Sequence, residues 1–285
     1  MPHSLRENAT TSDTKNIRIG RISYMNVAPV YYGLEYELKP EWMQIVKAPP
    51  AQLNRMLADG KLDISSVSSG AYALHADEWV ILPDLSISCH GPVMSVLLAS
   101  HKPLLALHQK KIILSEESAT AAALVRLIFN RSGITPELTT GPVLDPTVCA
   151  EFDHGAALVI GDAALTGDWS QCYRYVWDLG EMWRDLTGLP IVFAVWAVRK
   201  CFVEQNPELV GEVMHLFKTS KKKGLENLPK IIAGFSAERS ISESILNKYF
   251  EAMTYGLSGV HRKGLQAYQD LLFKDGIIPK PVNPN

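Results

Sequence analysis

The sequence predicts an α/β fold of two lobes, each built on a mainly parallel sheet flanked by helices, with a cleft between the lobes. Three observations support this prediction. The 285 residues, 47% of them apolar, approach the length of about 250–300 residues at which a single core stops growing. Strand and helix patterns alternate from the start of the patterned region, as in a parallel sheet with helical crossovers. Two strongly apolar strand candidates bracket a middle segment that has its own alternating pattern.

The first lobe is predicted to begin with a β-α-β-α-β series. Apolar residues alternate around Gly20 over 17–22 and predict a strand that ends in the segment 23–26, Ser-Tyr-Met-Asn. A helix is expected over 27–34, because Pro29 would lie in its first turn. The remaining elements of the series are a strand over 42–47, a helix over 50–59 and a strand over 62–65.

The two most apolar strand candidates mark where the chain is expected to pass between the lobes. They cover residues 92–100 and 191–198. Between them the pattern predicts a strand over 111–115, a helix over 118–131 and a strand over 155–160. The predicted division is a flexible leader over 1–16, a first lobe formed by 17–95 and 196–285, and an inserted second lobe over 96–195. A cleft between two such lobes is the usual location of a small-ligand site.

The last part of the chain is predicted to be helical. Apolar residues three and four apart indicate helices over 207–218, 242–255 and 260–274. Ser240 and Glu243 have the spacing of a capping box ahead of the second of these helices.

The charge balance excludes some classes of partner. With 28 Lys and Arg against 30 Asp and Glu, the formal net charge is −2, which argues against a nucleic-acid partner because neutralising phosphates requires a Lys/Arg excess. A small anion needs only a few backbone amides and remains compatible with this charge. No run approaches the ~18 apolar residues of a membrane span, and residues 1–16 lack an apolar signal region. We therefore expect a cytoplasmic protein without a membrane partner; the sequence does not indicate its oligomeric state.

Signatures of several common catalytic classes do not occur in the sequence. The four cysteines have no Cys-x-x-Cys spacing, which predicts buried free thiols and no metal site. The sequence also lacks a phosphate-binding loop, a dinucleotide-binding glycine turn, a serine-hydrolase elbow and a zinc-protease helix. Nucleotide hydrolysis, dinucleotide redox chemistry, serine hydrolysis and zinc proteolysis are therefore disfavoured.

Three short segments share a strand end that runs into small hydroxyl or amide residues and then a helix. They cover residues 23–26, 65–70 and 115–120. The first N–H groups of a helix lack partners within it and attract a carboxylate or phosphate, and the carboxyl ends of parallel strands are where ligands collect. Ser, Thr and Asn also cap helices when no ligand is present. Three such turns on one side of a cleft favour a binding site.

Individual polar residues at other strand ends have two interpretations. The amide of Asn26 offers both a donor and an acceptor to a substrate hydroxyl or carboxylate. Ser95 lies inside the apolar run 93–98, where a serine either serves a ligand or bonds to the backbone. Gly161 and Asp162 follow the strand over 155–160, and the carboxylate either binds a ligand or caps the next helix.

Several short motifs occur together over residues 17–200. They are 18–26 (Arg-Ile-Gly-Arg-Ile-Ser-Tyr-Met-Asn), 62–65 (Leu-Asp-Ile-Ser) with Ser68 and Ser69, 91–93 (Gly-Pro-Val) with Ser95, Ser118 with Thr120, 160–165 (Ile-Gly-Asp-Ala-Ala-Leu), 178–180 (Asp-Leu-Gly), 186–190 (Leu-Thr-Gly-Leu-Pro) and 193–197 (Phe-Ala-Val-Trp-Ala). Their joint pattern resembles that of the chorismate dehydratases of the futalosine route to menaquinone. One departure is Ala121, where the pattern has a serine.

The resemblance implies a type II periplasmic-binding-protein-like fold used as an enzyme. The implied reaction is a hydro-lyase step that removes water from chorismate to give 3-[(1-carboxyvinyl)oxy]benzoate, with no metal or organic cofactor. Loss of the ring C3 proton and the C4 hydroxyl creates an aromatic ring, so a site that positions the substrate and stabilises developing charge suffices. The implied base is the enolpyruvyl carboxylate of the substrate itself.

The resemblance also implies roles for individual residues. Asn26 and Ser95 are the implied catalytic residues, with Asn26 orienting the hydroxyl or the enolpyruvyl group. The implied substrate-binding residues are Ser23, Ser68, Ser69, Gly91, Ser118, Thr120, Gly161 and Asp162. The charge of Asp162 would oppose a dianion, so a structural role is an equal alternative for it.

Three other functions fit parts of the same pattern. A solute-binding receptor shares the fold, but such receptors carry an export signal. A related enzyme acting on cyclic dehypoxanthine futalosine would have a different motif after the first strand, so Ser-Tyr-Met-Asn over 23–26 favours the dehydratase. A ligand-binding regulator would need a partner-binding segment, and no DNA-binding segment is evident.

Overall fold

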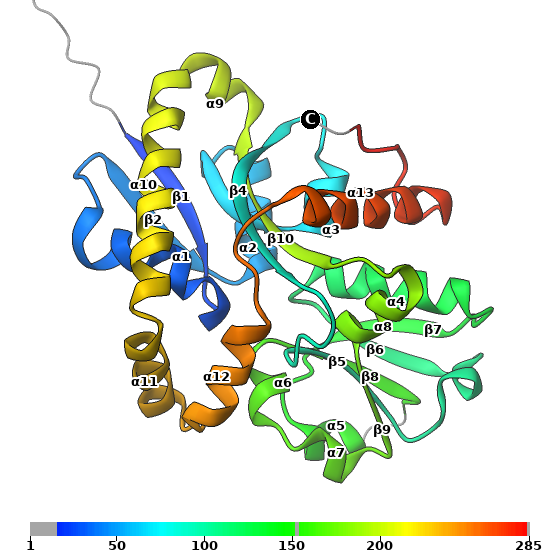
Figure 1. Ribbon diagram of the computed structural model, residues 1–285. Helices are drawn as coiled ribbons and strands as arrows, with labels where there is room; N and C mark the ends of the chain where they lie inside the picture. Colours follow the sequence, from blue (N-terminus) through cyan, green and yellow to red (C-terminus); the bar gives the residue numbers. More distant parts are fainter. Residues whose placement is uncertain (1–15, 152–153, 284–285) are drawn as a thin grey trace, which may run out of the picture.

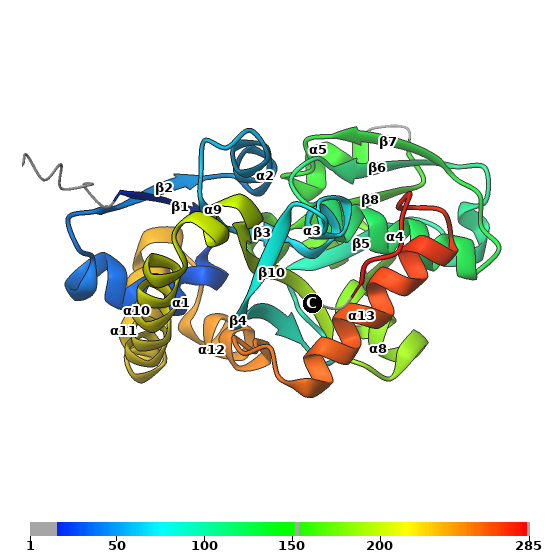
Figure 2. The ribbon, with the colours of Figure 1, turned by 90° about the horizontal axis from the view of Figure 1, so that it is seen from above.

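The computed structural model describes residues 16–151 and 154–283. They form two five-stranded sheets with helices packed around them, one sheet for each lobe (Figures 1 and 2). The strand orders are β2-β1-β3-β10-β4 and β7-β6-β8-β5-β9. The predicted leader over 1–16 lies outside the described residues, except for Asn16.

The first sheet begins with the predicted βαβ pattern. Its strands are β1 (Ile17–Ile22), β2 (Met43–Ala48), β3 (Ile64–Ser68), β4 (Trp79–Cys89) and β10 (Ile191–Arg199). β1 pairs in parallel with β2 and β3, whereas β10 lies antiparallel between β3 and β4. The sheet is therefore mixed and not mainly parallel as expected, since the chain returns from the second lobe in the opposite direction.

Short helices connect the strands of the first sheet. They are the 3₁₀ turn η1 (Met25–Val27), α1 (Ala28–Gly33), the π-turn η2 (Leu34–Leu38), α2 (Pro50–Ala58) and α3 (Ser69–Leu74). β3 extends three residues beyond its predicted end at Ser65, because Ser65 and Ser66 are fully buried between neighbouring strands. β4 was not predicted, because Pro83 and the positive φ of Asp84 interrupt its apolar pattern.

The second sheet contains the middle of the chain. Its strands are β5 (Val96–Ser100), β6 (Lys111–Ser115), β7 (Glu137–Gly141), β8 (Ala156–Ile160) and β9 (Tyr175–Asp178). Its helices are η3 (Leu104–Leu107), α4 (Ala119–Arg131), α5 (Pro146–Glu151), α6 (Asp162–Thr166), α7 (Trp169–Cys172) and α8 (Leu179–Thr187). β6 is parallel to β7 and β8, and β5 is antiparallel to β8 and β9.

The chain crosses between the sheets twice, and at both crossings the structure differs from the prediction. The predicted strand over 92–100 begins only at Val96, so Ser95 precedes β5 and does not lie inside a strand. The reason is the backbone of Met94, whose positive φ is incompatible with a continuous strand. β10 belongs to the first sheet from Ile191 onward, so the predicted lobe boundary at 195/196 falls within that strand.

The remaining helices are α9 (Lys200–Gln205), α10 (Pro207–Glu226), α11 (Leu228–Arg239), α12 (Glu243–Ala252) and α13 (Gly259–Lys274). The predicted capping box at Ser240 is wrong, because Ser240 ends α11 with a positive φ and Ser242 caps α12 through Ile245 N. α13 packs against β10 of the first lobe and α4 of the second (Figure 2). None of the helices in the described part of the chain is long and apolar enough to cross a membrane.

A buried carboxylate ties three strands of the first sheet together. Asp63 is 3% exposed, and its Oδ1 lies 2.8 Å from Arg18 Nη2 and 2.7 Å from Arg199 Nη2. Arg18 N also donates to Asp63 Oδ2 at 2.9 Å. Burial raises the pKa of Asp63, but the hydrogen bonds from Arg18 and Arg199 outweigh it, so the net shift of the pKa is downward.

Replacing Asp63 with alanine should lower the free energy of unfolding by about 3 kcal/mol, because two guanidinium groups lose their carboxylate. The pKa of Asp63 is lower in the folded than in the unfolded protein. The carboxylate therefore stabilises the folded state above the unfolded-state pKa of about 3.9, and this stabilisation is lost as the pH falls below that value. Urea unfolding at pH 7 and between pH 5 and 3 measures both effects. Asp59→Ala, at an exposed ion pair with Lys61, is the control and should change little. Equal losses in the two variants would contradict the assignment.

Candidate active site

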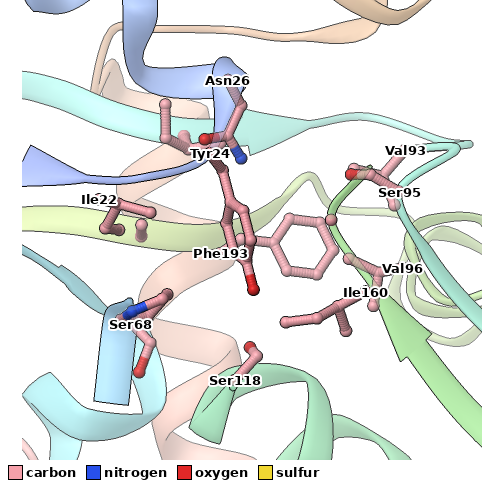
Figure 3. Close-up of a pocket in the computed structure, with 14 residues that line it drawn as sticks. Ile22, Tyr24, Asn26, Ser68, Val93, Ser95, Val96, Ser118, Ile160 and Phe193 are labelled. Carbon is pink, nitrogen blue, oxygen red and sulfur yellow. The ribbon is translucent and has the colours of Figure 1, made fainter. Parts of the chain in front are cut away.

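A narrow cavity of about 60 Å³ lies between the two lobes (Figure 3). The polar side chains that line it are Tyr24, Asn26, Ser68, Ser95 and Ser118. Its apolar walls include Ile22, Val93, Val96, Ile160 and Phe193. The three turns that the sequence singled out therefore each contribute to one cavity.

Two of the lining serines cap helices and face the cavity at the same time. Ser68 Oγ accepts a hydrogen bond from Ala71 N at 3.2 Å, and Ser118 Oγ accepts one from Ala121 N at 3.1 Å. A hydroxyl that accepts in this way still has its own O–H to donate. The capping and ligand-binding interpretations are thus compatible at both residues. Ala121, where the family pattern has a serine, contributes its backbone N–H to this cap.

Asn26 and Ser95 approach the cavity from opposite lobes (Figure 3). Asn26 Oδ1 is buried and has no hydrogen-bond partner among the described residues. Ser95 is 3% exposed, and its carbonyl accepts from Gly161 N at 2.8 Å. Gly161, which also lines the cavity, has a positive φ, so this backbone contact requires glycine.

Tyr249 of α12 lies close to both of these residues, and the sequence did not indicate it. Burial raises the pKa of Tyr249 to about 12, while hydrogen bonds from the side chains of Ser95 and Asn26 oppose that rise. Its side chain is 1% exposed. In the sequence Tyr249 is one apolar position of an amphipathic helix, so only its contacts in three dimensions reveal it.

A second unpredicted contact closes one side of the cavity. The Tyr24 hydroxyl donates to the Glu117 carboxylate, which joins the turn after β1 to the segment before α4. Burial and then this hydrogen bond raise the pKa of Tyr24. The tyrosine ring packs against Gly161, where a Cβ atom would lie 2.9 Å from the ring. Tyr24 therefore links the two lobes at the cavity wall.

The other residues predicted for the site surround the cavity without lining it. Ser69 and Thr120 are fully buried; the Thr120 hydroxyl donates to Phe193 O at 3.0 Å and accepts from Gly70 N at 2.9 Å. Gly91 O accepts from the Cys89 thiol at 3.2 Å. The remaining two residues are Ser23, which lines a different cavity, and Asp162, which forms an ion pair with Arg239.

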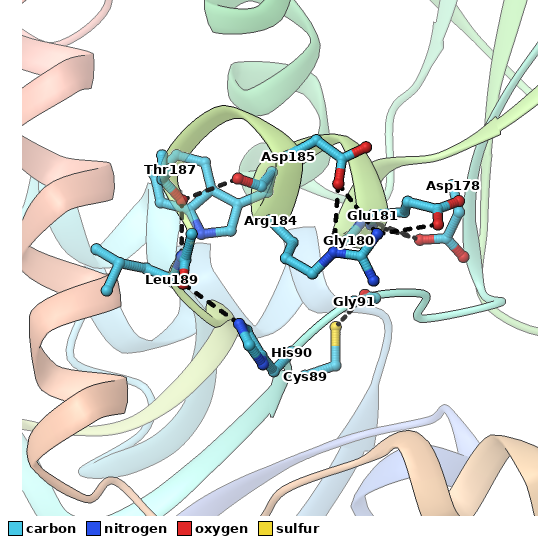
Figure 4. Close-up of polar contacts among 12 residues, drawn as sticks. Cys89, His90, Gly91, Asp178, Gly180, Glu181, Arg184, Asp185, Thr187 and Leu189 are labelled. Carbon is cyan, nitrogen blue, oxygen red and sulfur yellow. Dashed lines mark hydrogen bonds and ion pairs between the residues drawn. The ribbon is translucent and has the colours of Figure 1, made fainter.

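The Asp178 carboxylate holds the segment that precedes Ser95 and also the start of α8, where Figure 4 shows it beside Gly180 and Glu181. Asp178 accepts hydrogen bonds from the backbone N–H groups of Val93, Met94, Gly180 and Glu181, at distances of 2.6–3.3 Å. Burial raises the pKa of Asp178 against the opposing effect of these donors. Because Met94 has a positive φ, the carboxylate stabilises a backbone conformation that is otherwise unfavourable.

The cavity presents hydroxyl and amide groups but few charged ones. Within the described ranges, no group of three or more His, Cys, Asp or Glu side chains is arranged to hold a metal ion. The Glu117 carboxylate, which accepts from the Tyr24 hydroxyl, does not itself line the cavity. Such a site can orient a polar ligand and hydrogen-bond its anionic groups.

The chain is similar to known proteins over most of its length. A family model described as menaquinone biosynthesis matches residues 17–274. Chorismate dehydratase from Thermus thermophilus is 32% identical over 271 residues, which cover 89% of this chain and 94% of that protein. 1,4-Dihydroxy-6-naphtoate synthase from the same organism is 25% identical over 186 residues, 65% of this chain and 66% of that protein.

A solved structure confirms the predicted fold. The periplasmic aliphatic sulphonate binding protein SsuA from Escherichia coli superposes with a TM-score of 0.65 at 16% identity, covering 94% of this chain and 95% of that one. At this identity the likeness concerns the fold alone. The expected two-lobe, periplasmic-binding-protein-like architecture is therefore confirmed.

Proposed function

The chain belongs to the menaquinone biosynthesis family, and we propose that it is a chorismate dehydratase, which eliminates water from chorismate to form 3-[(1-carboxyvinyl)oxy]benzoate. The observation that carries the proposal is its 32% identity to the Thermus thermophilus dehydratase over 89% of the chain. The polar cavity between the lobes supplies a site of the required chemistry. A biosynthetic role favours a cytoplasmic location, which cell fractionation tests.

In the proposed mechanism the chain positions a dianion and the substrate supplies the base. Ser68 and Ser118, with the N-terminus of α4, hydrogen-bond the carboxylates of chorismate. Asn26 orients the C4 hydroxyl or the enolpyruvyl group, and Ser95 assists from the other lobe. The enolpyruvyl carboxylate takes the C3 proton, the C4–O bond breaks, and the departing hydroxide leaves as water with a proton returned from that carboxylate. The electron pair of the C3–H bond completes the aromatic ring.

Tyr24→Phe should raise KM for chorismate about tenfold with a smaller change in kcat. The hydrogen bond between Tyr24 and Glu117 joins the two lobes and favours their closure around the substrate. The variant loses this bond, so its closed form is less populated. Steady-state kinetics separate the two constants. Tyr175→Phe in β9, outside the cavity lining, is the control. An unchanged KM for Tyr24→Phe would show that this contact does not contribute to closure.

The decisive assay is to incubate the purified protein with chorismate and follow the products by mass spectrometry. The expected product is lighter than chorismate by the mass of one water. Chorismate that binds but is not converted would indicate a receptor of the same fold. Chorismate that is neither bound nor converted would reject the proposed substrate.

A further inference from the structure

A second and larger cavity lies next to the turn that carries Asn26. Ser23 lines this second cavity, whereas the next residue, Tyr24, lines the cavity between the lobes. Its walls come from β1, α1, η2, β2 and α11, which lie together on one side of the first lobe (Figure 1). Its volume of about 640 Å³ is in the range of small-molecule sites.

The charges of this cavity favour an anion. Four cationic side chains line it, and only two carboxylates do, those of Glu35 and Glu238. The cations are Arg21, Lys47, Lys230 and Arg239. An anionic occupant would balance this excess, part of which Asp162 offsets from outside the lining through its ion pair with Arg239.

Two of the cations have unused hydrogen-bonding capacity. Arg21 is 7% exposed, and its Nε lies 3.1 Å from Glu35 Oε1 but has no hydrogen-bond partner among the described residues. The same carboxylate oxygen is shared with Lys47 Nζ at 2.6 Å. Arg239 Nε is likewise buried without a hydrogen-bond partner among the described residues, although it lies 3.6 Å from Glu238 Oε1. Buried donors of this kind are costly unless a ligand uses them.

Aromatic side chains give the same cavity an apolar wall. The rings of Tyr32 and Tyr36 lie 4.9 Å apart between centroids. The ring of Phe235 lies 5.8 Å below the guanidinium of Arg239. A ring-bearing ligand can pack against such aromatic side chains while its acidic substituents reach the cations.

We propose that this second cavity binds a ring-bearing dicarboxylate. A ligand in this cavity would contact Arg239, which lines it. Arg239 also forms an ion pair with Asp162 of the second lobe, and the neighbouring Gly161 lines the cavity between the lobes. A ligand carboxylate competes with Asp162 for this guanidinium, so the second site communicates with lobe closure. The binding proposal does not depend on the dehydratase activity, because it is tested without turnover.

The test is calorimetric titration of the intact protein with benzene-1,3-dicarboxylate. Gly234 lines the cavity on α11, and a Cβ atom there meets nothing within 4 Å, so Gly234→Leu adds bulk at the cavity wall without a clash at its Cβ. Gly211→Leu is the matched control, since Gly211 lies inside α10 with equally open surroundings. The expected result is a binding event that Gly234→Leu removes and Gly211→Leu retains.

A charge-altering pair tests the same site independently. Lys230→Gln should weaken that binding event about tenfold, as expected for one lost cationic contact, whereas Lys222→Gln on exposed α10 surface should leave it unchanged. Binding that survives both Gly234→Leu and Lys230→Gln, or no binding to the wild-type protein, would overturn the proposal. Neither result bears on conversion of chorismate.

Discussion

Replacing Asn26 with alanine should lower kcat for chorismate by about 10²–10³-fold, the usual loss when one positioned hydrogen-bonding group is removed from a reacting centre. The Asn26 amide lies in the cavity wall with a buried Oδ1 that no described residue engages. That free acceptor is what a substrate hydroxyl would use. The fold should survive, because the amide does not satisfy a buried backbone group.

Asn54→Ala is the matched control for this experiment. Asn54 lies on α2 and also has a buried Oδ1 without a hydrogen-bond partner in the described residues, but it does not line the cavity. Its replacement should leave kcat unchanged. Circular dichroism and thermal unfolding verify that both variants fold. Near-normal turnover by Asn26→Ala would remove Asn26 from the central role in the proposed mechanism.

Asp178→Ala should lower both stability and turnover. The variant leaves four backbone N–H groups without their acceptor, which corresponds to a loss of about 3 kcal/mol in the free energy of unfolding. Turnover should fall because the carboxylate no longer stabilises the positive φ of Met94. The backbone before Ser95 would then change conformation, and Ser95 would move away from its position opposite Asn26. The adjacent packing leaves little room to compensate, since a Cβ at Gly180 would lie 2.4 Å from Gly91 O.

Urea unfolding and steady-state kinetics measure the two effects of Asp178→Ala. Asp168→Ala is the control, because Asp168 also precedes a helix but makes no side-chain hydrogen bond to the described backbone at that helix start. Its replacement should cost less than about 1 kcal/mol. Asp178→Ala with wild-type stability would show that the crossing segment is held by other contacts.

Local patterns predicted the elements whose determinants lie close together in the chain. β1 and β6 have the predicted bounds, and α4 begins one residue after the predicted start at Ser118, which caps it. The strand prediction over 92–100 was wrong in its first four residues. The apolar run is interrupted there by a backbone conformation that Asp178 stabilises, and Asp178 lies more than 80 residues away in the chain. The spacing of apolar residues contains no information about a hydrogen-bond partner so far away in the chain.

The candidate site was predicted in part for the same reason. The motifs predicted Asn26, Ser68 and Ser118 near one cleft, because each lies at a strand end or helix start, and all three line one cavity. Tyr24 and Tyr249 were missed, since their importance arises from contacts with Glu117 and with Asn26 and Ser95 on other elements. The roles of all these residues in turnover remain predictions for the variants described above.

The position of β10 between β3 and β4 also affects how the protein folds during synthesis. β3 and β4 do not pair with each other, and the strand that joins them is translated only after the whole second sheet. The second lobe can therefore assemble while two strands of the first still have open edges. Exposed edges of this kind invite pairing with other chains. These two edges of the growing polypeptide therefore stay open until residue 199, the end of β10, has left the ribosome.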